Sequence, residues 1–321
     1  MKISSIVDIV DGSLLNKPAI SFITQSHTNI KKVNDGDLFI SSDISEIFQA
    51  ISQGAFAIIS DCSSETFETF DNKEIALIKV NDIQNACISL LRFYLSNKSM
   101  KSYYTDDISF EIFGLLKENK DIILLENNIL DIFEQLKNFE NISTLISKNN
   151  KILSSIFPSS KVFEIKEYEL KNLIVHSLFE TSFSHHNIYY SKLKLSKIYI
   201  NNLLAVIEFL NIEELEIGKL REFKYMNAIF INPNFKIVEY GKSNKFIISN
   251  DNAKIAHEEI KFLQKNYAYA TIKIYEASLI DEFTLDFIKY EEFNALYIKG
   301  KNTNQIVNLL EHNYKKEISL L

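Results

Sequence analysis

The sequence feature that most constrains the fold is a short module over residues 34–61, in which two strand patterns flank one helix pattern. A turn at Asp35-Gly36 leads into an apolar strand at residues 38–40. The second strand, residues 55–59, is an almost continuous apolar run, which is typical of a strand that a parallel sheet buries on both faces. The module therefore predicts a β-α-β unit and an α/β fold.

The helix of this module has recognisable start and stop signals. Asp43, with Glu46 three residues later, forms a capping-box pattern that predicts the first turn. Ile47 and Ala50 recur at helical spacing on one face, and Gly54 ends the helix. The predicted helix thus occupies the whole connection between the two strands.

Strands and helices alternate through most of the remaining chain, which favours further parallel β-α-β units. The predicted strands are 75–80, 122–125, 144–146, 228–231, 236–239, 245–248, 271–275 and 295–298. The predicted helices are 82–94, 108–116, 129–139, 199–210, 253–266 and 304–312, with Thr303 as the cap of the last one. Three further runs, 162–165, 173–183 and 188–195, predict an antiparallel patch.

At 321 residues the chain is longer than a typical single domain. The polar stretch 97–107 has no apolar period and is predicted to connect two domains, and a third unit starts near Arg221. We therefore predict domains at 1–96, 97–220 and 221–321.

Charge and hydropathy limit the classes of partner. The net charge is −7 and the charged residues are interspersed, so the sequence favours no nucleic-acid partner. No apolar run approaches the roughly 20 residues that span a bilayer, and Asp8 and Asp11 interrupt the N-terminal apolar stretch, so we expect no membrane span and no signal peptide. These observations predict a cytoplasmic protein.

Four stretches, in the right order, resemble the Mur ligase family, and most of all its D-alanyl-D-alanine-adding branch. The first is the module at 36–61, with GDLF before the helix and Gly-Ala before the second strand. The others are LSKIYINNLLAVIEFL at 195–210, FIISNDNA at 246–253 and ALYIKGKNTNQIVNLL at 295–310. The resemblance implies a three-domain Mur-ligase-like α/β architecture, with a shortened central domain and a Rossmann-like C-terminal domain.

The resemblance also implies a chemistry whose sequence signals are missing. Mur ligases activate a carboxylate with ATP, and a glycine-rich loop with a lysine holds the phosphates. The corresponding stretch here is YYTDDIS at 103–109, which has no glycine and no lysine. Its two aspartates, Asp106 and Asp107, are predicted to complement a helix N-terminus, a role that we favour over a carboxylate pair for Mg²⁺ or for acid-base catalysis.

The nucleotide-sugar signature of the family is altered as well. Aligned on Gly36, the family's Asp-Ser-Arg falls on Asn29, Ile30 and Lys31, which keeps only the positive charge. The glycine-rich loop that contacts the UDP-sugar in the family has no counterpart after residue 39. Lys31 is therefore the one candidate for substrate binding in this region.

The C-terminal third supplies the other candidates for substrate binding. Asn252 matches the family's asparagine turn, and Lys299, Gly300 and Lys301 form a turn that precedes a helix and could hold an anion. The alternative, which we favour, is that Gly300 serves the shape of the turn. The GKS at 241–243 lacks the first glycine of a phosphate loop, because Lys236 stands five residues before Gly241, and it precedes a strand, so we predict a β-turn there.

No catalytic residue, metal ligand or cofactor is predicted. The pair His185-His186 is expected on a strand, where neighbouring side chains point to opposite faces and cannot hold one ion together. We therefore interpret it as the surface of a hairpin.

The sequence leaves three hypotheses for function. The first is a catalytically degenerate ligase-like protein that binds or scaffolds a cell-wall synthesis protein. The second is an active ATP-dependent amide ligase on UDP-muramyl peptides, with a nucleotide site rebuilt near Lys299 and Lys301. The third is a binder of muramyl-peptide precursors without chemistry.

Overall fold

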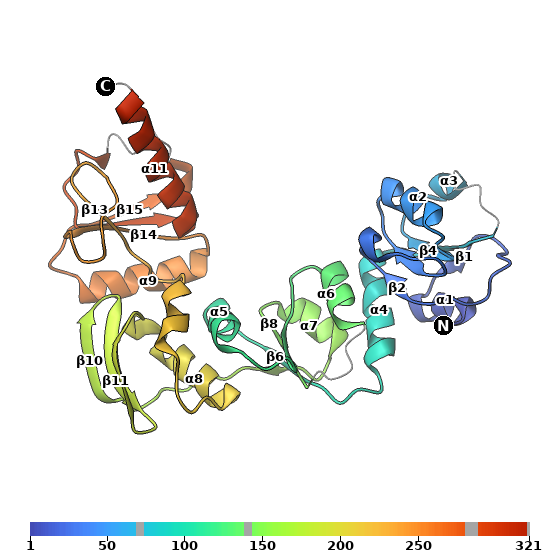
Figure 1. Cartoon of the computed structure of the whole chain (residues 1–321), viewed down its shortest axis with the longest axis horizontal. Helices are drawn as coiled ribbons and strands as arrows, with labels where there is room; N and C mark the ends of the chain where they lie inside the picture. The colour runs from blue at the N-terminus through green and yellow to red at the C-terminus, as the bar shows by residue number, and fades with distance from the viewer. Residues whose placement is uncertain (69–73, 138–142, 280–287, 320–321) are drawn as a thin grey trace. The chain divides into compact units, whose positions relative to one another are not determined.

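A computed structural model describes residues 1–68, 74–137, 143–279 and 288–319, and the end of the predicted helix 129–139 lies outside them. The chain forms two compact units (Figure 1). The first comprises residues 1–110 and 118–164, and the second comprises 111–117 and 165–321. The predicted boundaries near residues 96 and 220 stay predictions.

The first unit begins with a five-stranded sheet in the order β1-β5-β4-β3-β2. Its strands are β1 (Ser13–Leu14), β2 (Ser26–His27), β3 (Leu38–Ile40), β4 (Ala57–Ser60) and β5 (Ala76–Lys79), and its helices are α1 (Ile3–Val10), η1 (Ile30–Lys32), α2 (Ile44–Ser52), α3 (Ser64–Glu68) and α4 (Ile83–Leu95). Strands β2 to β5 are parallel, and β3 and β4 are buried on both faces. The predicted β-α-β unit is confirmed.

The start of α2 is capped as the sequence predicts, with one addition. The Asp43 carboxylate accepts hydrogen bonds from the backbone N–H groups of Ser45 and Glu46. The return half of the capping box runs through Ser41, whose hydroxyl accepts from the Asp43 N–H and donates to the Glu46 carboxylate. Gly54 follows the helix with a φ of +91°.

A second, parallel sheet completes the first unit in the order β7-β8-β6-β9. Its elements are β6 (Lys101–Tyr104), β7 (Ile122–Leu124), α6 (Ile129–Leu136), β8 (Thr144–Ser147), α7 (Asn150–Ile156) and β9 (Lys161–Val162). Helix α5 (Asp107–Leu116) begins in this unit, and its residues from Glu111 onward belong to the second. Helix α4 contacts both α1 and α6, so one continuous apolar core serves both sheets.

Two sequence predictions in this region are wrong. The stretch 97–107 contains the internal strand β6, which pairs with β8 and β9 although Lys101 and Tyr103 give it no apolar period. Backbone pairing on both edges holds this strand, and burial of Ser102 and packing of Tyr104 on the core add to it. Val162 pairs in parallel with Tyr104 and therefore belongs to this sheet, not to the antiparallel patch.

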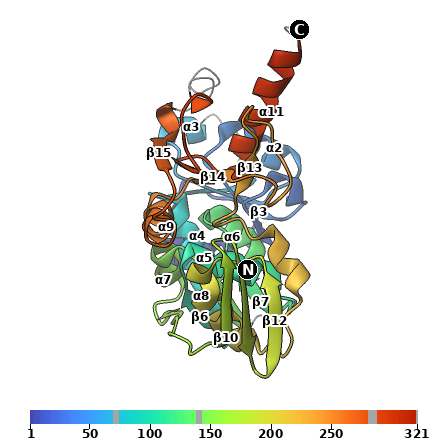
Figure 2. The ribbon, with the colours of Figure 1, turned by 90° about the vertical axis from the view of Figure 1, so that its left-hand side faces the viewer.

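The second unit contains an antiparallel sheet, β10-β11-β12, and a mixed sheet in the order β13-β14-β16-β15. The elements are β10 (Lys171–Ser177), β11 (Glu180–His185), β12 (Ile188–Leu193), η2 (Lys197–Tyr199), α8 (Ile200–Leu210), η3 (Ile217–Glu222), β13 (Ile229–Ile231), β14 (Lys245–Asn250), α9 (Ala253–Asn266), β15 (Ile272–Glu276), η4 (Ala277–Leu279), β16 (Ala295–Lys299) and α11 (Thr303–Ser319). Figure 2 shows the antiparallel strands side by side.

The antiparallel patch is confirmed, although the run 173–183 forms two strands joined by a turn. The predicted strand 236–239 is wrong, because only Ile237 makes an isolated bridge, to Ile231. The predicted cap of the last helix is also wrong by one residue. Asn302 accepts from the Gln305 N–H, and Gln305 accepts from the Asn302 N–H, so these two residues form the capping box.

Helices α9 and α11 lie on opposite faces of β14 (Figures 1 and 2). The alternation of side chains explains this arrangement. Ile247 and Leu296 pack in one core with Ile306 and Leu310 of α11. Tyr297, which points the other way, donates its hydroxyl to Glu259 of α9.

Glu259 is a fully buried carboxylate that collects donors from four separate segments. Oε1 accepts from the hydroxyl of Tyr199 at 2.5 Å and from the N–H of Met226 at 2.8 Å. Oε2 accepts from the hydroxyl of Tyr297 and, at 3.4 Å, from the side-chain amide of Asn250. Burial raises the pKa of Glu259, and these hydrogen bonds oppose the rise only in part.

The raised pKa of Glu259 predicts a pH dependence of stability. A carboxyl whose pKa is higher in the folded chain binds more protons there, so its contribution falls as pH rises from its ordinary value of 4.5 through the raised folded value. We expect the stability advantage of the wild type over Glu259→Gln to shrink across that window. Urea denaturation of both proteins at several pH values measures the difference in their free energies of unfolding. A difference that stays constant or grows with pH contradicts the raised pKa of Glu259.

A second prediction concerns Gly54. A Cβ at this residue would lie 2.5 Å from Oδ1 and 3.2 Å from Cα of Asp35, and its φ is +91°. Gly54→Ala should therefore lower the free energy of unfolding by about 1–3 kcal/mol. Gly218→Ala is the matched control, because a Cβ there meets nothing within 4 Å. Urea denaturation should show a lower free energy of unfolding for Gly54→Ala and no such loss for Gly218→Ala. Equal stability of the two variants would contradict the predicted strain at residue 54.

Candidate functional site

A polar crevice lies at the carboxyl ends of β14 and β16 in the second unit. Its cavity of about 310 Å³ is lined by residues 249–251, 302–304, 221–222, 224–225 and 227. The helices that follow the two strands, α9 and α11, leave on opposite faces of the sheet, so the crevice is a topological switch point. Open α/β sheets bind their ligands at such points.

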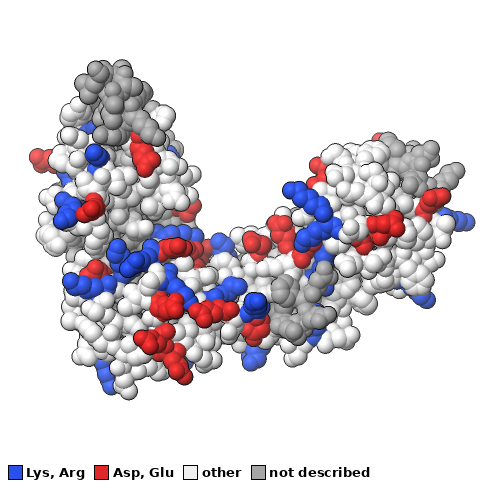
Figure 3. All heavy atoms as spheres, viewed as in Figure 1, with Lys and Arg blue, Asp and Glu red and all other residues white. Residues whose placement is uncertain are grey.

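Both charge signs are present in the crevice lining. Arg221 and Lys224 contribute positive charge, and Glu222 and Asp251 contribute negative charge. Lys224 also forms an ion pair with Glu111 at 2.9 Å. On the face that Figure 3 shows, acidic and basic side chains are likewise interspersed.

Asn252, a predicted substrate-binding residue, is the N-cap of α9 beside the crevice. Its Oδ1 accepts from the N–H groups of Lys254 at 3.0 Å and Ile255 at 3.3 Å. Its own N–H donates to the side chain of Asn250. Two N–H groups in the first turn of α9 are thus satisfied by a side chain of the chain itself.

The turn Lys299-Gly300-Lys301, also predicted as substrate-binding, is tied to the segment after β15. Lys299 forms an ion pair with Glu276, and Nζ of Lys301 donates to the carbonyl of Ala277 at 3.1 Å. Gly300 has a φ of +85°, and a Cβ there would lie 3.1 Å from Cβ of Ala277. These contacts favour the shape of the turn over anion binding.

The turn between β6 and α5 stands where the resemblance would place the phosphate loop. Oδ1 of Asp106 accepts from the Ser109 N–H at 2.6 Å, and Asp107 lies 3.5 Å from Nζ of Lys148. A carboxylate therefore occupies a helix N-terminus that a phosphate would need. The predicted role of the two aspartates as N-terminal charge agrees with this geometry.

The segment from His27 to Lys31 packs against a buried ion cluster, centred on Glu134, that the sequence did not predict. Oε1 of Glu134, on α6, accepts from the N–H groups of Thr28 at 2.6 Å and Asn29 at 3.4 Å. Burial disfavours the charged form of Glu134, but its hydrogen bonds outweigh this and lower its pKa. Lys31 itself is exposed on η1.

His27 and Lys137 complete this cluster. Nζ of Lys137 lies 2.9 Å from Oε1 of Glu134 and 2.6 Å from Nδ1 of His27. Nε2 of His27 lies 3.4 Å from the carboxylate of Asp37. Burial, followed by the Lys137 charge, lowers the pKa of His27, which keeps its imidazole neutral near pH 7. No sequence signal pairs residue 27 with residues 134 and 137, because the contact is made only by the fold.

The prediction that His185 and His186 both lie on a strand is wrong, and with it the geometric reason for excluding a shared ion. His186 is not on a strand: it occupies a turn with a φ of +46°, and the two ring centroids are 4.0 Å apart. Their ligand atoms, with a carboxylate oxygen of Glu208, all lie within 4.8 Å of one another.

The chain resembles Mur ligases of known structure. It matches a MurF from Acinetobacter baumannii with 11% identity and a TM-score of 0.56 over 98% of each chain. It also matches the UDP-N-acetylmuramoylalanyl-D-glutamyl-2,6-diaminopimelate–D-alanyl-D-alanyl ligase from Acinetobacter baumannii, with 10% identity and a TM-score of 0.52 over 98% of each chain. A MurF ligase from Thermotoga maritima in complex with ADP matches with 12% identity and a TM-score of 0.50, over 92% of this chain and 98% of that one.

No protein-family model and no curated protein matches the sequence. At these identities the likeness shows the fold, and the chain has the mixed α/β fold of Mur ligases across nearly its whole length. No helix among the described residues is both long and apolar enough to cross a membrane.

The capping geometry of Asn252 gives a testable prediction. Asn252→Ala should lower the free energy of unfolding by about 1 kcal/mol, because two N–H groups lose their acceptor, whereas Asn252→Asp should retain the cap. Asn304→Ala is the same change within the crevice lining, and it serves as the control because the capping box of α11 is formed by Asn302 and Gln305. Urea denaturation of the three variants decides it, and a fully stable Asn252→Ala protein would exclude the capping role.

Proposed function

We propose that the chain is a catalytically degenerate MurF-like protein, a non-enzymatic binding or scaffold partner in peptidoglycan precursor synthesis. The fold likeness to MurF ligases supports the placement in that process. The main observation in favour of lost catalysis is that Asp106 caps the helix at the β6–α5 turn.

The electrostatics of that turn support the absence of ATP chemistry. Phosphoryl transfer depends on positioning and on charge stabilisation by backbone N–H groups, a lysine and Mg²⁺. In the first unit, Asp106 and Asp107 place two carboxylates at the helix start, and Lys148 pairs with Asp107. A triphosphate would have to displace a cap and approach two like charges.

The ion cluster at Glu134 supports the proposed loss of UDP-sugar binding in the first unit. The resemblance aligns the UDP-sugar signature with Asn29, Ile30 and Lys31. The adjoining N–H groups of Thr28 and Asn29 already donate to the Glu134 carboxylate. An internal anion thus satisfies donors that would otherwise be open to a ligand.

The alternative is an active amide ligase on UDP-muramyl peptides with a nucleotide site near Lys299 and Lys301. The crevice at β14 and β16 is the feature that favours it, because it is polar and lies at a switch point. Against it, both lysines are engaged by the segment around Glu276 and Ala277.

An ATP titration separates the two. A bound ligand at 100 times its dissociation constant stabilises a fold by about 2.7 kcal/mol, which raises the melting temperature. Because we propose that this chain binds no ATP, we expect its melting temperature to stay unchanged in millimolar ATP and Mg²⁺. An active MurF ligase measured in parallel is the positive control. An ATP-dependent rise for this chain would overturn the proposal.

Phosphate release completes the test. With UDP-muramyl tripeptide, D-alanyl-D-alanine, ATP and Mg²⁺, the chain should release no phosphate above background. Release that is lost in Lys299→Ala would instead establish the alternative ligase. Calorimetry with the UDP-muramyl tripeptide alone distinguishes a binder of the precursor from a scaffold for a protein.

A further inference from the structure

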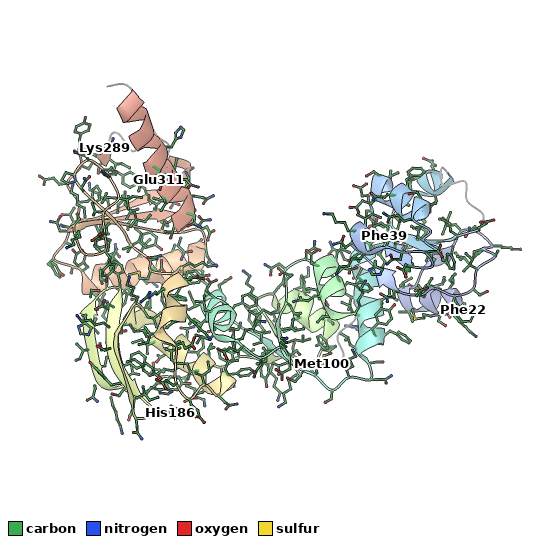
Figure 4. The ribbon with its side chains drawn as sticks, viewed as in Figure 1. Phe22, Phe39, Met100, His186, Lys289 and Glu311 are labelled. Atoms are coloured by element: carbon green, nitrogen blue, oxygen red, sulfur yellow. The ribbon has the colours of Figure 1, made fainter. Side chains whose placement is uncertain are left out.

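The end of the β11–β12 hairpin brings together three side chains that can ligate a metal ion. His185 is the last residue of β11, His186 follows in the turn, and Glu208 comes from α8. Figure 4 shows His186 at the end of this hairpin. One ligand atom from each residue lies within 4.8 Å of the other two.

The turn geometry explains how two neighbouring histidines can face one point. His185 pairs with Ile188, so the loop consists of His186 and Asn187, with φ values of +46° and +65°. Two positive φ values define a type I′ turn, which matches the twist of the hairpin. On a strand the imidazoles would diverge, but the left-handed residue turns the second ring back against the first.

The surroundings of Glu208 and His185 differ: the carboxylate has a hydrogen-bond donor, and the imidazole has a nitrogen without a partner. The hydroxyl of Tyr168 donates to Oε2 of Glu208 at 2.9 Å, which orients the carboxylate. Among the described residues, Nε2 of His185 is enclosed and has no hydrogen-bond partner. A buried polar atom without a partner is costly, and a bound cation would satisfy it.

We propose that His185, His186 and Glu208 bind a transition-metal ion of the Zn²⁺ class. Two imidazoles and one carboxylate match the ligand preference of Zn²⁺, whereas Mg²⁺ and Ca²⁺ prefer oxygen ligands alone. Ligand bonds of about 2.0–2.2 Å require the three atoms to close in by a small side-chain adjustment.

The site has room for further ligands. A cavity of about 640 Å³ adjoins it and is lined by His186, Glu208, Asn211 and Glu213, among others. Three protein ligands beside an open cavity leave a coordination position for water or for a small anion. The site shares no residue with the crevice at β14 and β16, so it does not rest on the proposed function.

Calorimetric titration of the full chain with ZnCl₂ tests the proposal, on tag-free protein stripped with a chelator. We expect one saturable site in the wild type. His186→Asn keeps the turn, because asparagine tolerates a positive φ, and removes the imidazole. Glu208→Gln keeps an acceptor for Tyr168. Each variant should weaken Zn²⁺ binding at least about tenfold.

His257→Ala is the matched control, because His257 is an exposed histidine on α9 outside the cluster. It should bind Zn²⁺ as the wild type does. Far-ultraviolet circular dichroism and melting curves without metal establish that all variants are folded. Absorption of the Co²⁺-substituted wild type supplies a second readout, and its ligand-field bands should disappear in His186→Asn.

Three outcomes overturn the proposal. They are the absence of saturable Zn²⁺ binding in the wild type, unchanged affinity in both His186→Asn and Glu208→Gln, and an equal loss of affinity in His257→Ala. The last would indicate that scattered surface histidines account for the binding.

Discussion

A buried carboxylate must be solvated by the protein, and this constraint organises each of the two units. Glu259 collects hydroxyl, amide and backbone donors, and so fixes α9 against β14, β16 and the segment before α8. Glu134 collects Thr28, Lys137 and Lys32, and so fixes α6 against the start of the N-terminal sheet. Removal of any one donor would leave the buried carboxylate short of a hydrogen bond. The elements that supply the donors therefore stabilise one another.

The same constraint bears on function. A carboxylate and a phosphate use the same donors: backbone N–H groups, lysines and helix N-termini. Glu134 takes the N–H groups of Thr28 and Asn29, and Asp106 takes that of Ser109. Internal anions in these positions stabilise the fold without a ligand. In a nucleotide-dependent ligase the phosphates themselves would fill that role, so capping by the chain and phosphate binding are alternatives at each place.

The sequence was sufficient wherever a signal is local. The β3-α2-β4 unit, with its Asp43 cap and its end before Gly54, follows from neighbours within one turn, and helix α9 follows from its apolar period. Strand β6 could not be found this way, because its residues have no apolar period and its place is set by pairing with the distant strands β8 and β9. The histidine pair was misassigned because a two-residue turn without glycine carries a weak signal, and His186 adopts its positive φ in the context of the hairpin.

Buried strand residues and the turns at strand ends differ in what a substitution costs. Buried strand residues such as Ile58 and Leu296 are held by packing on both sides, where a change leaves a cavity or an overlap. The turns at the carboxyl ends of strands need only a backbone path and a cap. Their residues, Thr105 and Asp106 among them, can therefore change at little cost to the core. A fold can be shared at 11% identity in this way, and function must be argued from the site rather than from the fold.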